Sequence, residues 1–426
     1  MFIARSARRI RFARIVFLLV GVLPCAALAA WAAHLRSAGH RESLRARWQQ
    51  AIGLPLRVEA VEHLRPGVVR GRGCVLTAQH GGVPLAVPLV EIEDAPGELR
   101  LRVERIDLDA DAAGLAAGLV AEWLAREARF PRDCVVDVEE LHWRVPGWPT
   151  IDRTSTAGRL RLECVARDGS RAIRCVLSPA AGGPPAELRI VRAAGAGDRP
   201  DAGRHDVTAG CTAPLPLAIV ARLLEVAALP ALPTGAAVVS GGTLAASEGE
   251  AGWRGHLAAR LERVDLASYS RRGGWRGAGL ADVDVRRLEW GQGQVSFVEA
   301  EVLVGPGDVG RGVVDCLIRD FGCRPREGLF GIPVDTAPRF DAAGMLLRLD
   351  RRGVEILAPT RMHGALAIAA GRPLLDPPAA IVPLSRLADW LAGPGTGADP
   401  NVGSDGMWSR LRDRLPRDPP AGRPGL

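Results

Sequence analysis

Residues 102–109 read "RVERIDLD" and residues 260–267 read "RLERVDLA", so nearly the same eight letters occur twice. Before each Glu-Arg pair, apolar and charged residues alternate, as in a strand with one buried face. After the pair the alternation resumes out of phase, because Val103 is followed by Ile106, three positions on where a strand expects two. The second copy repeats this shift. The phrase therefore indicates a feature of strand shape and not a catalytic motif.

Two interpretations explain the shift, and a third stretch shows it around Arg286-Arg287. One extra residue forms a β-bulge, which keeps the same face buried and bends the strand. Alternatively, the two halves of each strand bury opposite faces. Under the first interpretation three long strands make a curved sheet with one apolar concave face. The candidate groove or core residues are Leu101, Val103, Ile106, Leu108, Leu261, Val264, Leu266, Val283, Val285, Leu288 and Trp290.

The chain from Leu54 onward follows the same two-residue period. Short apolar-alternating segments separated by Gly and Pro run from Leu54 onward, and helical patterns interrupt them at 112–128 and 214–229. Helix-rich alternation of strands and helices is missing, which disfavours a doubly wound parallel sheet. We expect a mainly β chain: an elongated curved antiparallel sheet, groove or half-barrel-like, with two or three helices, preceded by one N-terminal transmembrane helix.

Residues 15–33 form an uncharged apolar segment of 19 residues, long enough to cross a bilayer as a helix. Arginines crowd before it, which favours a cytoplasmic N-terminus and an exported remainder. Small residues near its end leave a cleaved signal peptide open, and Cys25 leaves lipidation open. We expect a single-pass protein of the inner membrane with a periplasmic bulk. The candidate membrane-facing residues are Ile15, Phe17, Leu18, Leu19, Leu23 and Trp31.

The chain is expected to divide by function and composition into five parts. They are a cytoplasmic basic tail at 1–14, the anchor at 15–33, an N-terminal β-rich region at 34–230, a C-terminal β-rich region at 231–392 and a flexible Gly-, Pro- and Asp-rich tail at 393–426.

The formal net charge of +7 does not indicate nucleic-acid binding. Five arginines in residues 1–14 and a net +3 in residues 34–47 leave about −1 for the remainder, since 7 − 5 − 3 = −1. A nucleic-acid-binding domain needs a basic face, and here the excess flanks the apolar segment. We expect no nucleic-acid partner.

The eight cysteines contain no CxxC pair, which argues against zinc and thioredoxin-like sites. "GRLRLECVARDGSRAIRCVLSP" at 158–179 predicts a hairpin around Asp168-Gly169. Counting from that turn, Cys164 lies opposite Ile173 and Cys175 opposite Leu162. The two thiols are then diagonal, about 7 Å apart at the backbone, and we expect them to be buried and free.

The sequence contains no complete enzyme motif, so we expect no catalytic, cofactor-binding or metal-binding residues. "GPGDVG" at 305–310 matches the G-x-G-x-x-G pattern of dinucleotide-binding loops, but Pro306 sits in the turn and no βαβ units surround it. Asp107, Asp109 and Asp111 have EF-hand spacing, but the required loop Gly is Ala112. No zinc-protease or serine-hydrolase motif occurs.

"RARWQQAIGLPLRVEAVEHLRPGVVRGRG" at 45–73 resembles the opening of AsmA-like (AsmA/TamB-type) envelope proteins. Gly53, Val58, Pro66 and Gly67 carry this resemblance, and "AAGMLLRLDRRGVEI" at 342–356 resembles the family's late hairpins. The resemblance implies no enzyme but an apolar β-sheet groove for lipid handling or envelope assembly, with membrane lipids and envelope proteins as partners. An envelope scaffold without a lipid groove is the alternative; its sheet would be packed shut by the helices at 112–128 and 214–229.

Overall fold

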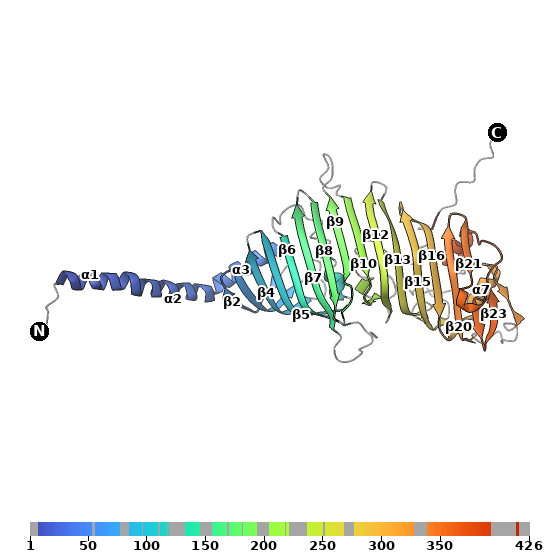
Figure 1. Cartoon of the computed structure of the whole chain (residues 1–426), viewed down its shortest axis with the longest axis horizontal. Helices are drawn as coiled ribbons and strands as arrows, with labels where there is room; N and C mark the ends of the chain where they lie inside the picture. The colour runs from blue at the N-terminus through green and yellow to red at the C-terminus, as the bar shows by residue number, and fades with distance from the viewer. Residues whose placement is uncertain are drawn as a thin grey trace, which may run out of the picture. The chain divides into compact units, whose positions relative to one another are not determined.

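The structure is a computed structural model of the whole chain (Figure 1). It describes residues 7–52, 56–76, 85–95, 97–109, 111–116, 118, 133–144, 156–167, 170–180, 182–193, 204–217, 219–220, 237–249, 252–267, 277–327, 339–392 and 415–416. Two compact units divide it, unit 1 at Met1–Ala95 and unit 2 at Pro96–Leu426. The chain is mainly β, with a large, mostly antiparallel curved sheet and an N-terminal apolar helix, so the predicted fold class is confirmed.

Unit 1 consists of a long N-terminal helical stretch followed by short paired strands. Its elements are α1 (Ala7–Phe17), the π-helical turn η1 (Leu18–Val22), α2 (Leu23–Arg36), α3 (Ala38–Ile52), β1 (Leu56–Arg57), β2 (Ala60–Arg65), β3 (Val68–Leu76) and β4 (Leu85–Ala95). Strand β3 pairs antiparallel with β1, β2 and β4. Arg14–Arg36 is long and apolar enough to cross a membrane, and its most apolar part is not buried in the protein. The predicted membrane-facing side chains, Ile15 to Trp31, are exposed.

Helix α3 is separate from α2 and begins after Ser37. Ser37 is extended (φ −68°, ψ 150°), and its Oγ accepts the His40 amide at 3.2 Å, which caps α3. Leu44 and Trp48 of α3 are buried. Arg45 Nε and Gln49 Nε2 both donate to the carbonyl oxygen of Leu56, at 2.9 and 3.0 Å, which fixes α3 against β1.

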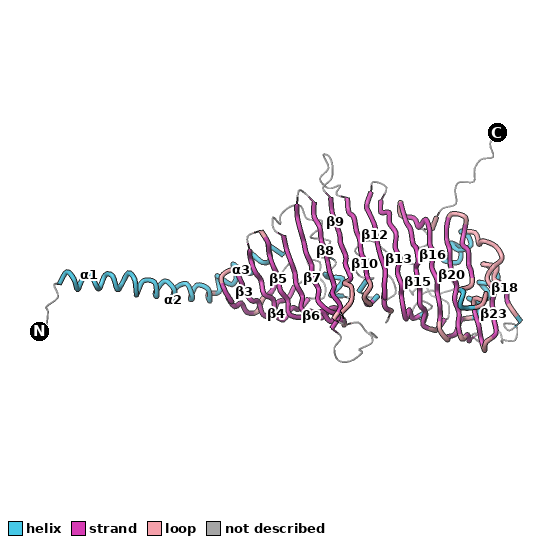
Figure 2. The backbone as a smooth tube through the Cα atoms, viewed as in Figure 1, coloured by secondary structure: helices cyan, strands magenta, loops and turns pink. Residues whose placement is uncertain are grey.

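Unit 2 is built on a sheet whose strands lie side by side nearly in chain order (Figures 1 and 2). Its main strands are β5 (Glu98–Leu108), β6 (Asp133–Trp143), β7 (Thr156–Arg167), β8 (Ser170–Pro179), β9 (Ala186–Ala193), β10 (Arg204–Cys211), β12 (Val238–Gly249), β13 (Gly252–Asp265), β15 (Leu280–Gly291), β16 (Gln294–Val304), β20 (Ala342–Asp350) and β21 (Gly353–Leu357). Each pairs with the next in this order.

Shorter elements complete unit 2. They are β11 (Leu215–Pro216), β14 (Gly277–Ala278), β17 (Gly307–Val309), α7 (Arg311–Arg319), β18 (Arg324–Pro325), β19 (Arg339–Phe340), the 3-10 turn η2 (Thr360–Met362), β22 (Ala367–Ala369), β23 (Arg372–Asp376) and α9 (Leu384–Ala392). Strands β14, β17 and β19 form a separate small sheet.

The β5–β6 pair is parallel, unlike the other pairings between described strands of unit 2. Parallel neighbours need a crossover connection. Residues 111–116, at the start of the predicted helix 112–128, are helical and belong to this crossover. Asp109 Oδ1 accepts the Ala112 amide at 2.7 Å, so Asp109 is a helix N-cap. Residue 118 is also helical, and the other residues of the predicted helix lie outside the described residues.

Bulges occur where the sequence alternation shifts. The β13–β15 register slips between Leu261 and Val264, and Arg263 has φ +60°. The β15–β16 register slips at Arg286. The β5–β6 register is continuous through "RVERIDLD", because β6 carries the same shift of alternation. The register slip lies between Val138 and Leu141 of β6, where β6 pairs with β7. The bulge interpretation is therefore confirmed for β13 and β15, whereas at β5 the register shift is seen in its neighbour β6 against β7.

Helical residues also cover one end of the sheet. Of the predicted helix 214–229, residues 217, 219 and 220 are helical and residues 214–216 are not. The other residues of this prediction lie outside the described part of the chain. Leu217 and Ile219 are buried, and Leu217 clusters with Val239, Val264 and Ala281.

A second cluster closes the C-terminal end. It joins Phe321 to Leu349, Val354, Ile356 and neighbouring apolar residues, with α7 and α9 packed against it. Leu415, inside the predicted flexible tail, packs on this cluster, and Pro416 beside it is buried. The other residues of the tail lie outside the described part of the chain.

The predicted boundary at 230/231 falls inside unit 2. Strand β10, on one side of it, pairs with β12, on the other, from Asp206–Ser247 to Cys211–Gly242. The two predicted β-rich regions therefore contribute strands to one sheet.

Candidate functional site

One face of the unit 2 sheet carries an unbroken row of apolar residues that are paired directly across neighbouring strands. Directly paired residues point to the same face of a sheet. The row comprises Leu101, Val136, Leu162, Cys175, Leu188, Ala209, Leu244, Leu257, Leu288, Val298, Leu349 and Val354. We call it the central apolar row. At the usual strand spacing it runs for about 50 Å across the sheet.

A second row lies two residues along each strand and continues the same face. It comprises Leu99, Cys134, Cys164, Ile173, Ile190, Val207, Ala246, Gly255, Trp290 and Val295. The Trp290 ring fills the space above Gly255, because a Cβ at Gly255 would lie only 2.6 Å from Trp290 Cζ2. Together the two rows form a broad apolar strip.

The central apolar row is half-buried over most of its length. From Leu101 to Val298 its residues retain partial exposure, and only Leu349 and Val354, in the C-terminal cluster, are fully buried. Apolar side chains left partly in water across many strands are the usual mark of a binding surface. The strip is therefore closed at its C-terminal end and partly accessible before it.

The sequence-predicted groove residues fall on this face in two groups. Leu101, Leu288 and Trp290 belong to the two rows, and Val285 pairs with Ala259 and Ala300 beside them. The others lie nearer the strand ends that β11 and the helical residues after it cover. Ile106 and Leu108 pack in the cluster of Leu141, Leu177 and Ala186, and Leu261, Val264, Leu266 and Val283 pack with Leu217. This part of the predicted groove is filled.

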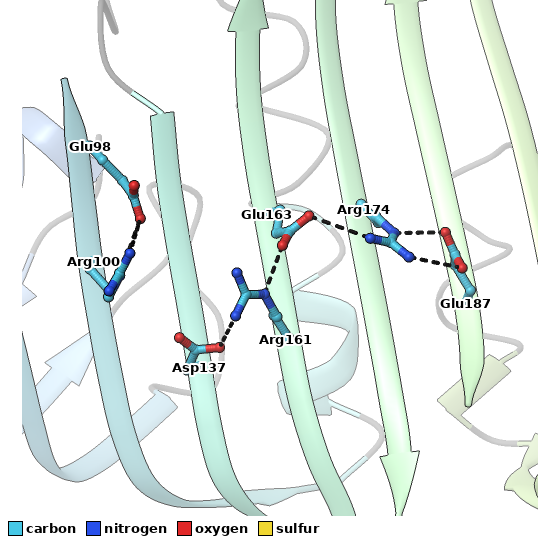
Figure 3. Close-up of polar contacts among 7 residues, drawn as sticks. All are labelled: Glu98, Arg100, Asp137, Arg161, Glu163, Arg174 and Glu187. Carbon is cyan, nitrogen blue, oxygen red and sulfur yellow. Dashed lines mark hydrogen bonds and ion pairs between the residues drawn. The ribbon is translucent and has the colours of Figure 1, made fainter. Parts of the chain in front are cut away.

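The opposite face of the same strands is charged. Figure 3 shows Arg161 between Asp137 and Glu163, with its Nε 2.7 Å from Glu163 Oε1 and its Nη1 3.5 Å from Asp137 Oδ1. Arg174 continues the network to Glu187, Nε to Oε1 at 2.8 Å. The pKa of Glu187 is lowered by its hydrogen bond with Arg174. Ion pairs between exposed side chains keep this face in water.

A polar pair lies at the rim of the apolar face. His205 Nδ1 is 2.5 Å from Glu248 Oε2, and the His205 ring stacks near Trp253 with centroids 6.4 Å apart. His205 and Glu248 each lie two residues beyond a member of the second row, Val207 and Ala246. They are therefore polar groups on the apolar side, near the strand ends.

Three thiols lie together on the apolar face. Cys134 pairs with Cys164, and the expected pairings of Cys164 with Ile173 and of Cys175 with Leu162 are confirmed. All three are free; Cys164 is buried, whereas Cys134 and Cys175 are half-buried. Burial raises the pKa of Cys134 to about 11 and, with its neighbouring thiols, that of Cys164 to about 12. Such thiols behave as small apolar side chains.

The weak chemical motifs have structural explanations. In "GPGDVG", Gly307 lies in β17 so close to β14 that a Cβ would stand 2.0 Å from the Ala278 carbonyl oxygen, and Gly310 precedes α7. Asp109 is a helix cap, as described above. Among the described residues, no group of three or more His, Cys, Asp or Glu side chains is placed to hold a metal ion.

Sequence reasoning missed most of the central apolar row. Leu162, Leu188, Leu244 and Val298 come from strands with ordinary alternation, and no motif distinguishes them. Their significance lies in the register of the pairings, which aligns one residue from each strand into a single row from Leu101 to Val354. The available signal was the alternation itself, which assigns each residue a face but not a neighbour.

Comparisons with known proteins add no assignment to this geometry. No protein-family model, no curated protein and no solved structure matches the chain.

Proposed function

We propose that this chain is a membrane-anchored envelope protein of AsmA-like type that holds lipid acyl chains against the central apolar row. The observation that carries the proposal is the half-buried row from Leu101 to Val298, backed by a charged opposite face. The action is passive, since covering apolar surface is favourable by itself, and it needs no catalytic residue.

The energy available is adequate for binding. Transfer of a CH₂ group out of water is worth about 0.8 kcal/mol. A 16-carbon chain resting on the sheet with about half its surface covered would therefore gain roughly 6 kcal/mol before the cost of ordering. The row is long enough for more than one such chain end to end.

The placement of the chain is part of the proposal. The exposed apolar helix Arg14–Arg36 is long enough for single-pass anchoring, and the arginines before it favour an N-terminus on the cytoplasmic side of the inner membrane. Unit 2 would then lie in the periplasm. Protease added to spheroplasts should digest unit 2 while intact cells protect it; resistance in spheroplasts would contradict this orientation.

Site-specific photocrosslinking tests the lipid-binding face. A benzophenone amino acid at Leu257, in the central apolar row, should form adducts with phospholipid in membranes. The matched control is His256, the next residue along β13, which is exposed and faces the other side of the sheet. Mass spectrometry should find lipid on the Leu257 variant and not on the His256 variant. Absence of lipid at Leu257, or equal labelling at both, would overturn the proposal.

The alternative is an envelope scaffold without a lipid groove. The filled end of the face favours it, because Leu217 and Val220 already pack against the region of Val264 and Ala281. A scaffold would present the strip to a protein partner, so the Leu257 variant would form protein adducts in place of lipid adducts. Detergent-extracted protein would then also carry no phospholipid by mass spectrometry.

A further inference from the structure

Three histidines gather in unit 1 where the spanning helix meets the first strands. His34 is in the last turn of α2, His40 in the first turns of α3, and His63 on β2. The ring centroids are 5.0 Å apart for His34 and His40 and 5.1 Å apart for His40 and His63. The arrangement brings residues 23 positions apart in the chain into contact, and neither the proposed function nor the fold uses it.

The His40–His63 pair is the notable contact. Their Nε2 atoms face each other at 3.1 Å. As a hydrogen bond, this contact needs one ring to carry its proton on Nε2 and the other on Nδ1. The same separation also suits two ligands of one metal ion. With metal–nitrogen bonds of about 2.0–2.1 Å, nitrogens 3.1 Å apart subtend about 100° at the metal, between the octahedral and tetrahedral values.

We propose that His40 and His63 form a binding site for a divalent transition-metal ion of the Zn²⁺, Ni²⁺ or Cu²⁺ class. The two Nε2 atoms supply two ligands and water fills the other positions, since no third ligating side chain is placed with them among the described residues. His63 is exposed and His40 half-buried, so an ion reaches the site from solvent.

The groups around the two imidazoles influence how tightly they bind a metal ion. The pKa of His40 is lowered by partial burial and by the neighbouring His63, His34 and Arg47. Neutral imidazole is the ligating form. The Arg47 charge also opposes a cation, so we expect micromolar binding and not the tighter binding of closed structural sites.

A bound ion would join α3 to β2. The ion would hold the first strands at a fixed position relative to the helix that follows the membrane span. This role is independent of lipid binding in unit 2.

Metal titration of the full-length chain tests the site. The protein is purified in detergent without a polyhistidine tag, stripped with EDTA and titrated with Zn²⁺ by calorimetry. Wild type should bind one ion, and His40→Gln and His63→Gln should each weaken binding at least about tenfold. His34→Gln should bind within about threefold of wild type, and the distant His256→Gln should bind as wild type does.

Cu²⁺ spectroscopy gives a second, structural readout. Electron paramagnetic resonance of the Cu²⁺-loaded wild type should show coupling to two imidazole nitrogens, and His63→Gln should lose one. Far-ultraviolet circular dichroism confirms that each variant is folded. No Zn²⁺ uptake by wild type, unchanged affinity in both His40 and His63 variants, or nitrogen coupling that survives in His63→Gln would overturn the proposal.

Discussion

The backbone amide of Arg263 donates a hydrogen bond to Oδ1 of Asp282, 3.2 Å away on the neighbouring strand. Arg263 is the residue with φ +60° in the β13 bulge, and the register slips by one residue around it. The bulge amide is thus removed from the ladder and satisfied by a side chain. This contact lets Leu261 and Val264 point to the same face although they are three positions apart.

Arg263→Gly should stabilise unit 2, because a left-handed backbone costs an arginine about 1 kcal/mol that glycine does not pay. The matched control is Arg260→Gly, at an exposed strand position three residues earlier without positive φ, which should destabilise by about 1 kcal/mol. Urea unfolding measures both. Destabilisation of similar size in both variants would show that position 263 is not strained.

Gly255→Ala should destabilise unit 2 by about 2 kcal/mol, because the added methyl group meets the Ala245 carbonyl oxygen at 2.5 Å and the Trp290 ring at 2.6 Å. Gly249→Ala is the control, since its nearest neighbour would be 3.9 Å away. Thermal unfolding followed by tryptophan fluorescence reports both stability and the environment of Trp290. Equal midpoints for the two variants would contradict the packing of Trp290 over Gly255.

The thiols of Cys134, Cys164 and Cys175 should make the protein less stable in alkali. Burial raises the pKa of Cys134 and Cys175 to about 11 and that of Cys164 to about 12, above the ordinary value of 9.0. The unfolded chain therefore releases these protons first, so stability is intact below pH 9 and falls as pH rises towards 11–12. A triple Cys→Ala variant should show a smaller fall between pH 9 and 10.5 in urea unfolding. An unchanged slope would contradict the raised values.

The same thiols should resist modification at neutral pH, because the reactive thiolate is suppressed. A chromogenic disulfide reagent should label Cys134, Cys164 and Cys175 only after denaturation, as located by peptide mass spectrometry. Rapid labelling of Cys164 in the native protein would show that the apolar face is more open than its burial indicates.

Arg174→Ala should weaken the charged face only at low ionic strength. Arg174 joins Glu163 and Glu187, and all three side chains are in contact with water. Exposed ion pairs contribute little and are screened by salt. We expect a small drop in the melting temperature at 10 mM salt that vanishes at 0.5 M. A drop that persists in high salt would indicate packing by the arginine stem.

The sequence predicted the fold class and an apolar N-terminal helix long enough to cross a membrane, and it indicated bulges as one of two interpretations, because each depends on a local pattern. Val103 and Ile106, or Leu261 and Val264, reveal a shift of alternation without any knowledge of partners. The parallel β5–β6 pair was not predicted, because strand direction depends on the crossover after Asp109 and not on the strands themselves. Whether helical residues fill the face was left open as an alternative, since Leu217 reaches Val264 only in the folded chain.

The nearest-neighbour order of the unit 2 strands has a consequence for how the sheet is made. Most strands pair with the strand that precedes or follows them in the chain, so contacts form by closing short loops, which is fast. Folding of such an array can begin in several hairpins and spread along it, as in repeat proteins. The β5–β6 junction differs from the others in direction: the two strands are parallel, so they cannot form a hairpin, and 24 residues lie between Leu108 and Asp133. Strand β5 should therefore join β6 later than the hairpin-linked strands join one another.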